Sequence, residues 1–355
     1  MNFGPQHYVP VLKVKRGEKR ALRSIAPSFQ QRITPLLEIV ERKGDPAPTI
    51  DAHLATALKD LADSVRPYPR CFLDTRELAP DGPTVAAELF AQASAANILF
   101  TPVTGISRTA DVAAALAYQT HGIAIRLTRA EMEAGGLAIC LRAFMSNHSL
   151  DPGQTDLIMD LGPVDDMVAD GVVAMMDAFL AGVPDHGSWR TFTISACAFP
   201  SSMGGVEKHS FDLVERVEWV AWQDALHGQR GSLARLPTFS DCAIQHSKGV
   251  EGYDPRTMPV SASIRYALRD RWLLVKGEST RRTAPSVQFP QLATKLVYGD
   301  LRMHFTGPAH CEGCRLMKDA ADGAPRLGSA EAWRRLGTIH HLTTTIGGLD
   351  SLPWP

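Results

Sequence analysis

Charged side chains stand at the ends of short β-branched runs along this 355-residue chain. The acids at these positions are Glu38, Asp74, Asp160 and Asp241, and the bases are Lys13, Lys15, Arg76 and Arg126. Carboxylates could hold a hard divalent cation or divide general acid and general base roles. Lysine and arginine bind phosphate and carboxylate groups. These residue types predict a polar site for an anionic ligand, with phosphoester hydrolysis as the reaction to test.

The same residues could also neutralise one another. Lys13 and Lys15 lie two positions apart, so a strand would place both on one face, where either could pair with Glu38 or remain solvated. Asp74 and Arg76 have the same spacing and could bind a polar substrate or each other. The spacing alone does not choose between a ligand site and a set of ion pairs.

Arg126 lies in the apolar run IAIRL, where a guanidinium has to find acids or an anionic ligand because it keeps its proton. It is therefore the best single candidate for ligand recognition. Ser195 shares a strand face with Cys197, but no nucleophile elbow surrounds it. We expect Ser195 to contact a ligand rather than to act as a nucleophile.

A separate group of candidate metal ligands lies near the C-terminus, in HFTGPAHCEGC. Cys311 and Cys314 form a Cys-x-x-Cys motif, which can bring two thiolates to one tetrahedral ion, and Gly313 helps the backbone to turn. Nearby histidines could complete a structural zinc site: His304, His310, His340 or His341. Because the chain has no second Cys-x-x-Cys and the histidine spacing is not that of a standard zinc finger, two other interpretations stay open: redox chemistry, and ordinary thiols beside a turn.

These candidates need a fold that gathers strand ends, and the chain has the pattern of one. Eight β-branched runs alternate with helix-compatible stretches, as in a (β/α)8 barrel, whose chemistry lies at the carboxyl ends of its strands. The runs cover residues 9–15, 33–40, 70–77, 97–105, 122–129, 155–162, 190–198 and 237–245. We therefore predict an α/β fold, a TIM-like (β/α)8 barrel over residues 1–245.

The stretches between the runs predict outer helices. They cover residues 51–62, 84–95, 109–120, 130–145, 165–181 and 211–227, and a shorter helix around ALRSIA stops at Pro27. After residue 245 the rhythm ends: residues 246–258 predict a loop over the barrel mouth, and two strand-like runs around Asp270 predict a hairpin. A helix over 290–298, the cysteine segment and a C-terminal helix complete an α+β cap over residues 246–355, packed on the barrel.

Composition excludes several classes of function. With 37 basic and 38 acidic residues, the formal net charge of -1 does not support a global field for nucleic acid or anionic membrane. No apolar run reaches the roughly 20 residues of a bilayer span, and the N-terminus has no basic segment before an apolar core, so we expect a cytoplasmic protein without a membrane partner. Rossmann, Walker A, His-Glu-x-x-His and helix-turn-helix motifs are absent.

The opening YVPVLKVKRGEKRALRSIAPSFQQRITPLLEI resembles the start of the phage beta-protein family, and the similarity continues through LDTRE to the C-terminal W-R-R-x-G-T-x-H-H. It covers most of the chain. The resemblance implies mobile-element or phage-conflict biology, including antiviral defence, and attaches no reaction. It marks Lys15, Glu18, Glu38, Asp74 and Arg76 as family-like positions without assigning their roles.

Two hypotheses follow. In the first, a barrel pocket recognises a small anionic ligand through Lys15, Arg76 and Arg126 while the acids act as catalysts or as ligands of a divalent metal at the barrel rim. In the second, the protein is a non-catalytic module that binds a protein partner from the same phage-conflict system. The rim charges are then ion pairs, and the cap surface carries the function.

Overall fold

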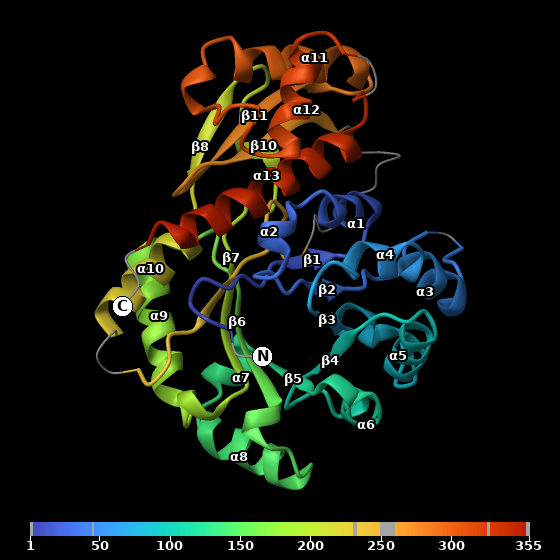
Figure 1. Ribbon diagram of the computed structural model, residues 1–355, viewed down its shortest axis with the longest axis vertical. Coiled ribbons are helices and arrows are strands. Elements are labelled where there is room, and N and C mark those ends of the chain that lie inside the picture. The colour runs from blue at the N-terminus through green and yellow to red at the C-terminus, as the bar shows by residue number, and fades with distance from the viewer. Residues whose placement is uncertain (1–2, 45, 230–232, 249–259, 325–326, 353–355) are drawn as a thin grey trace.

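The computed structural model describes residues 3–44, 46–229, 233–248, 260–324 and 327–352, and within them it confirms the predicted barrel. Eight parallel strands pair in chain order into one sheet (Figure 1). They are β1 (Val11–Lys13), β2 (Leu36–Glu38), β3 (Cys71–Asp74), β4 (Phe100–Thr104), β5 (Ile123–Thr128), β6 (Thr155–Pro163), β7 (Thr191–Cys197) and β9 (Thr238–Ser240). The sheet closes because the Val9 amide donates to the Phe239 carbonyl (3.1 Å) and the Val11 amide donates to the Asp241 carbonyl (2.8 Å).

The barrel interior explains why charged residues meet at one end. A cluster of small and apolar side chains, one from each strand or just beyond it, fills the middle: Val11, Leu36, Phe72, Val103, Ala124, Ile158, Cys197 and Cys242. Because strand side chains alternate between faces, residues two positions from these also point inward. Toward the carboxyl end, the next inward residue is charged on five strands. It is Lys13 on β1, Glu38 on β2, Asp74 on β3, Arg126 on β5 and Asp160 on β6.

Helices surround the barrel between the strands, as the sequence predicts. They are α1 (Arg16–Arg23), α2 (Pro27–Gln30), α3 (Ile50–Leu58), α4 (Leu61–Val65), α5 (Val85–Ala95), α6 (Thr109–Ala117), α7 (Arg129–Glu133), α8 (Leu137–Asn147), α9 (Ala169–Gly182) and α10 (Val217–Gln229). Short 3-10 turns cover Arg76–Asp81, Gln119–His121, Pro152–Gln154, His186–Ser188, Met203–Gly205 and Arg302–His304. α1 ends at Arg23, before Pro27, and Pro27 instead opens α2, because a proline at the first helical position needs no amide hydrogen. Two adjacent left-handed glycines, Gly135 and Gly136, divide the stretch predicted as one helix into α7 and α8.

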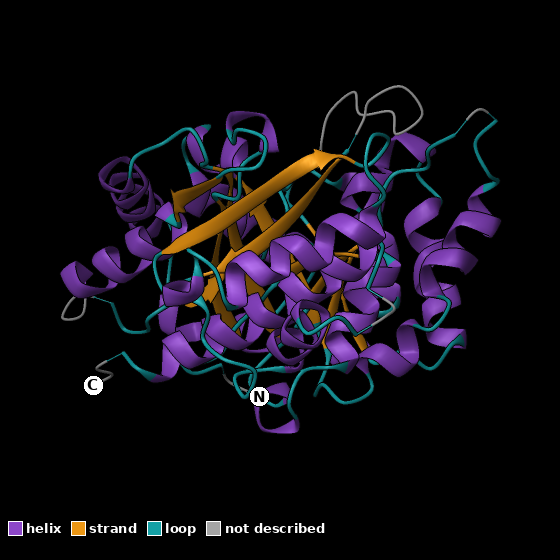
Figure 2. Ribbon diagram, turned by 90° about the horizontal axis from the view of Figure 1, so that it is seen from above, coloured by secondary structure: helices purple, strands orange, loops and turns teal. Residues whose placement is uncertain are grey.

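The prediction of a helix from residue 211 is wrong for its first residues. Phe211–Glu215 forms β8, and α10 begins only at Val217. β8 pairs antiparallel with β11 (Arg271–Ser279), which forms the predicted hairpin with β10 (Ser261–Ala267). The cap sheet therefore has the order β10-β11-β8, and its third strand comes from the barrel part of the chain. Figure 2, seen from above, shows the long antiparallel strands lying across the barrel strands.

Three helices complete the cap: α11 (Pro285–Val297), α12 (Glu312–Ala321) and α13 (Ala330–Asp350). Figure 1 shows α13, in red, running between the cap and the barrel. Trp333 and Leu336 pack into the cap core, whereas Ile339, Leu342 and Ile346 pack into the barrel core. One helix thus belongs to both hydrophobic cores. Most of the loop predicted over the barrel mouth, residues 249–258, lies outside the described residues.

Among the described helices, none combines the length and the apolar character that a bilayer span requires.

Candidate functional site

Arg126 is the centre of the charged group at the barrel mouth. Its side chain is 1% exposed. One terminal nitrogen, Nη1, donates to Glu38 Oε1 (2.6 Å) and Asp74 Oδ2 (2.8 Å), and Nη2 donates to Asp160 Oδ2 (2.7 Å). Four predicted site residues from four strands, β2, β3, β5 and β6, therefore meet at one buried guanidinium.

Two more predicted bases contact the acids that surround Arg126. Arg76, at the start of the turn after β3, bonds Glu38 Oε1 (2.9 Å) and Asp160 Oδ2 (2.7 Å). Lys13 Nζ lies 2.6 Å from Glu38 Oε2 and 3.2 Å from Glu77 Oε1. Lys13 is buried, whereas Arg76 keeps 28% of its side chain exposed. Arg76 is therefore the cation of this network that faces solvent.

The sequence reasoning missed Arg108 and Asp111, which follow β4. Arg108 Nη1 donates to Asp74 Oδ1 (2.7 Å), and Arg108 Nη2 donates to Asp111 Oδ2 (2.6 Å). Asp111 also accepts the Thr75 hydroxyl (2.8 Å). Arg108 could have been found by the rule that selected the others, since the segment Gly-Ile-Ser-Arg directly follows the fourth predicted strand. Because Arg108 bonds one oxygen of Asp74 and Arg126 bonds the other, both oxygens of this carboxylate contact arginines.

The electrostatics of the mouth keep its acids ionised. Burial by itself would raise the pKa of Glu38, but Arg126, Lys13 and Arg76 outweigh burial and hold that pKa below its ordinary value. Arg126 and Arg76 do the same for the pKa of Asp160. Arg108 together with Arg126 and Arg76 holds the pKa of Asp74 far below its ordinary value. At neutral pH none of the three carries the proton that a general acid must donate.

Asp241 does not join these acids. Inward-facing Cys242 is its neighbour, so the strand alternation turns Asp241 to the outer face of the barrel. There its carboxylate accepts hydrogen bonds from the Tyr8 hydroxyl (2.5 Å), His341 Nε2 (2.9 Å) and Arg216 Nη2 (3.2 Å). This arrangement separates Asp241 from the mouth acids, and it also places His341 with Asp241 rather than with the cysteines. The Asp241 cluster ties the barrel to α13.

Ser195 points into the barrel and is paired in register with Asp160. It is buried, and its hydroxyl oxygen has no hydrogen-bond partner among the described residues. Ser195 therefore lies next to the charged group on the neighbouring strand but makes no hydrogen bond to it.

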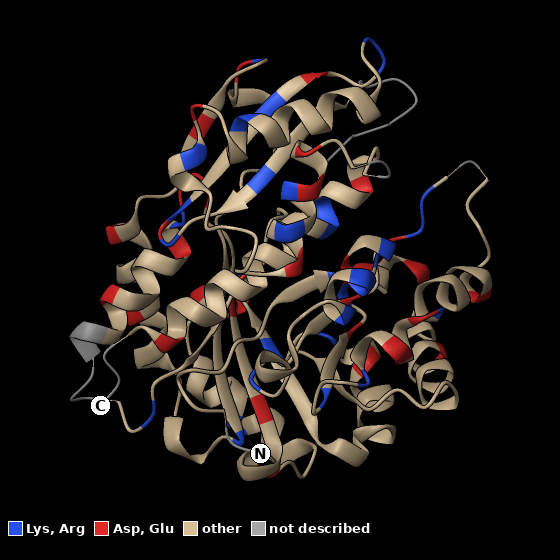
Figure 3. Ribbon diagram, turned by 45° about the horizontal axis from the view of Figure 1, so that its top comes forward, with Lys and Arg blue, Asp and Glu red and all other residues tan. Residues whose placement is uncertain are grey.

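A second set of cations lies where the cap meets the mouth: Lys15, Arg265 and Arg334. Burial and neighbouring Arg334 together lower the pKa of Arg265 to about 10, against the opposite effect of Glu18. Partial loss of hydration lowers the pKa of Lys15, and Arg334 acts in the same direction, whereas Glu18 raises this pKa. Figure 3 shows Lys and Arg segments gathering at this junction.

These junction cations, Lys15, Arg265 and Arg334, differ from the mouth bases in one respect. No described carboxylate lies within ion-pair distance of any of them. Arg265 instead donates to the Ile244 carbonyl (2.7 Å) and lies over the Phe199 ring (4.8 Å). The sequence reasoning singled out Lys15 and quoted Arg334 within W-R-R, but it assigned neither Arg334 nor Arg265 to a site.

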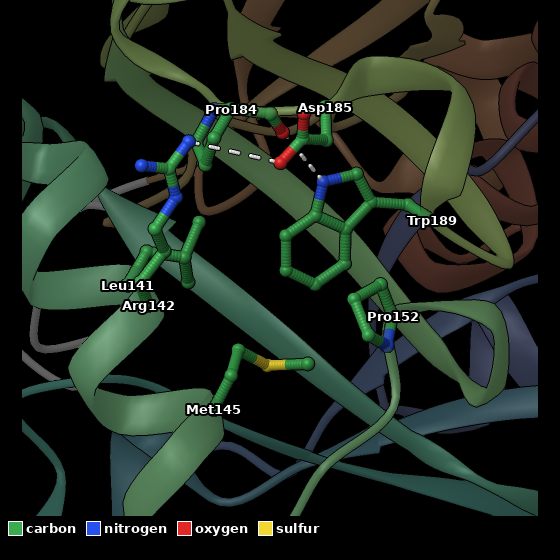
Figure 4. A pocket seen from close by; sticks show the side chains of 7 residues that line it. All are labelled: Leu141, Arg142, Met145, Pro152, Pro184, Asp185 and Trp189. Carbon is green, nitrogen blue, oxygen red and sulfur yellow. Dashed lines mark hydrogen bonds and ion pairs between the residues drawn. The ribbon is translucent and has the colours of Figure 1, made fainter.

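A cavity of about 120 Å³ lies at the other end of the barrel, before β6 and β7 (Figure 4). It is lined by Leu141, Arg142, Met145, Pro152, Pro184, Asp185 and Trp189. Trp189 Nε1 donates to the Pro184 carbonyl (3.2 Å), and Arg142 lies 3.7 Å from Asp185. The lining is mainly apolar and contains none of the predicted site residues.

The predicted metal ligands come together in part. The ligand atoms of Cys311, Cys314 and His340 all lie within 4.8 Å of one another. His310 lies beside this group, with its ring centroid 5.2 Å from that of His340.

The fold and the two charged groups define a TIM-like barrel protein with an ion-paired mouth and an α+β cap. Over residues 8–347 the sequence matches the family described as Beta protein. Because the match covers nearly the whole chain, the protein belongs to this Beta protein family, as the resemblance predicted. No curated protein matches the chain.

Proposed function

We propose that this Beta protein family member binds a small anionic ligand, bearing phosphate or carboxylate groups, where the cap meets the barrel mouth. The observation that carries the proposal is the set of junction cations, Lys15, Arg265 and Arg334, which have no described carboxylate within ion-pair distance, although Glu18 lies near two of them. Like charges held close together repel one another, and an anion placed between them removes that repulsion.

The ion pairs beneath the junction support the same proposal. Glu38 and Asp160 hold Arg76 in one orientation, while its side chain stays partly exposed. A guanidinium that is already ordered loses less conformational entropy when a ligand binds. Arg76 can therefore extend the positive surface of Lys15 and Arg334 toward the mouth.

We do not extend the proposal to phosphoester hydrolysis. Glu38, Asp74 and Asp160 are the acids that such a reaction would use, and each is bonded to at least two basic side chains. A metal ion would have to displace Arg126 from them, and a general acid would need a raised pKa rather than a lowered one. The acids are better suited to holding the arginines. The resemblance to the phage beta-protein family supports a role for this binding in phage-host conflict.

The test is calorimetric titration of the full chain with inorganic pyrophosphate, and with citrate as the carboxylate probe. We expect Arg334→Gln and Lys15→Gln each to weaken binding about 10-fold or more, since a hydrogen bond to a charged group contributes about 1.5–3 kcal/mol. Arg66→Gln is the matched control, because Arg66 is exposed at the C-terminal end of α4 and paired with Asp63. Binding should also weaken as salt increases.

Unfolding of the ligand-free variants separates a binding role from a structural one. If the junction cations await an anion, Arg334→Gln removes repulsion and leaves the free energy of unfolding equal to that of the wild type or higher. The proposal fails if neither probe binds, or if Arg66→Gln weakens binding as much as Arg334→Gln. If neither anion binds, the next hypothesis to test is that the protein is a non-catalytic module that binds a protein partner.

A further inference from the structure

We infer that Cys311, Cys314, His340 and His310 form a structural zinc site inside the cap. The proposal is independent of anion binding at the mouth, because it rests on a different set of residues. Three ligand atoms, from Cys311, Cys314 and His340, already lie within 4.8 Å of one another. In a tetrahedral zinc site with two sulfur and two nitrogen ligands, the ligand atoms lie about 3.3–3.8 Å apart. A modest contraction of this group would therefore enclose an ion.

The first turn of α12 directs both sulfur atoms to the same point. Cys311 is the N-cap residue of α12, and its sulfur accepts the Cys314 backbone amide (3.3 Å). The glycine between them is required by close packing, because a Cβ at Gly313 would lie 2.5 Å from the Leu336 carbonyl oxygen. The amide groups of a helix N-terminus favour negative charge, which suits two thiolates. The motif is thus built as a turn that presents two sulfur ligands toward α13.

His340 on α13 presents the correct ring nitrogen. Its Nε2 bonds the Ala267 carbonyl (2.7 Å), and this contact requires the proton to be on Nε2. Nδ1 then carries the free lone pair, and it lies 3.2 Å from Cys314 Sγ. The ring also stacks on Tyr266, with centroids 3.7 Å apart. A backbone carbonyl that fixes the tautomer of a histidine is the usual arrangement behind a metal-binding imidazole.

His310 is placed to supply the fourth ligand. Its Nε2 bonds the Thr344 hydroxyl (3.0 Å), and when Nε2 donates in this bond the Nδ1 lone pair is free for a metal. The two rings have centroids 5.2 Å apart. Two imidazoles bound through Nδ1 to one tetrahedral ion would have centroids about 5 Å apart, given a Zn–N bond of about 2.0–2.1 Å. The His310 side chain lies outside the 4.8 Å group, so it has to turn toward the sulfur atoms when the ion binds.

Such a site would connect three elements of the cap. Cys311 and Cys314 belong to α12, His340 belongs to α13, and the carbonyl that orients His340 ends β10. Zinc has no redox chemistry and prefers closed four-ligand sites when its role is structural. The buried positions of Cys314 and His340 fit a structural ion better than a reactive thiol.

The experiment is elemental analysis of the full chain purified without chelator, followed by titration of metal-free, reduced protein with Co²⁺. We expect one zinc per chain, and the visible bands and thiolate charge-transfer absorption of tetrahedral cobalt. Cys311→Ser should lose both signals and still fold, because serine is a good N-cap and keeps the hydrogen bond to the Cys314 amide. Cys140→Ser is the matched control, since Cys140 is an exposed cysteine on α8.

The histidine variants define the ligand set. His340→Asn should abolish tetrahedral cobalt binding, and His310→Asn should weaken zinc binding by at least 10-fold, whereas His304→Asn should leave it unchanged. Unaltered affinity in His310→Asn would overturn the assignment of the fourth ligand. Protein that contains no zinc and does not bind Co²⁺ after reduction would overturn the whole site, as would equal metal loss in Cys311→Ser and Cys140→Ser.

Discussion

Replacing Arg126 with methionine tests whether the barrel mouth is a network of mutually dependent ion pairs. Methionine keeps an unbranched apolar side chain in the interior and removes the charge, so the change acts mainly on Glu38, Asp74 and Asp160. Removing one partner of a buried ion pair usually costs about 3–5 kcal/mol, because the other charge stays buried without compensation. Here Arg76 and Lys13 still contact Glu38, and Arg108 still contacts Asp74. We therefore expect the lower end, a loss of about 3 kcal/mol in the free energy of unfolding at pH 8.

The same substitution has a pH dependence whose sign follows from the pKa shifts. In the wild type the pKa values of Glu38, Asp74 and Asp160 lie below their ordinary values. These acids thus stabilise the folded protein above their unfolded pKa values, and that contribution is lost as the pH falls through the folded ones. Without Arg126, burial raises the pKa values, so the variant gains stability relative to the wild type as the pH falls. The deficit should be larger at pH 8 than at pH 5.

Urea denaturation followed by tryptophan fluorescence at both pH values measures this deficit. Arg129→Met is the matched control, because Arg129, three positions along the chain, keeps 41% of its side chain exposed and pairs with Glu133 on one helix. Such exposed pairs contribute about 0.3–0.5 kcal/mol. A deficit below about 1 kcal/mol for Arg126→Met, or one that is equal at pH 5 and pH 8, would refute the argument from mutual dependence.

Three further predictions concern the packing around α13 and α10. Asp241→Asn should destabilise the protein by about 3 kcal/mol in thermal or urea unfolding, because Arg216 and His341 would share an uncharged partner. A change in the free energy of unfolding within about 0.5 kcal/mol would contradict a structural role for the Asp241 carboxylate. Burial raises the pKa of Glu218 from its ordinary 4.5 to about 8. The protonated Glu218 side chain therefore stabilises the folded protein fully below pH 4.5, and this contribution is lost as the pH rises through about 8. Glu218→Gln should remove this decline in stability, and a variant less stable than the wild type at pH 9 would disprove the prediction. Gly313→Ala should lower the melting temperature because of the Leu336 carbonyl, whereas Gly205→Ala, where a Cβ meets no atom within 4 Å, should leave it unchanged.

The barrel could be predicted from the sequence because its signal is local. Each strand is a short apolar run, and each run is followed by a stretch with helical character, so neighbours in the chain are neighbours in the sheet. The strand β8 could not be found in this way. Its partner β11 lies more than 50 residues further along the chain, and Phe211–Glu215 leads directly into a real helix, so its apolar residues were attributed to that helix.

For the candidate site, too, the sequence predicts what depends on neighbours in the chain and not what depends on residues from distant segments. Their position at strand ends was enough to predict that Glu38, Asp74, Arg126 and Asp160 lie together at one mouth of the barrel. Whether an acid at the mouth binds a ligand or an arginine depends on residues from other strands, and the sequence left that choice open. Asp241 was grouped with the mouth acids because only its position at a strand end was considered, and not the face to which the alternation turns it.

The origin of β8 has a consequence for the order in which the protein can fold during synthesis. The strand leaves the ribosome after β7 and before the last barrel strand, β9, but its partner β11 follows both. The nascent chain must therefore carry an unpaired strand edge while the barrel closes, and that edge is a template for pairing with another chain. A circular permutant that begins at residue 216 would make β11 before β8, so that β8 could pair as soon as it is synthesised. Truncation at residue 245 would instead remove the partner of β8 altogether.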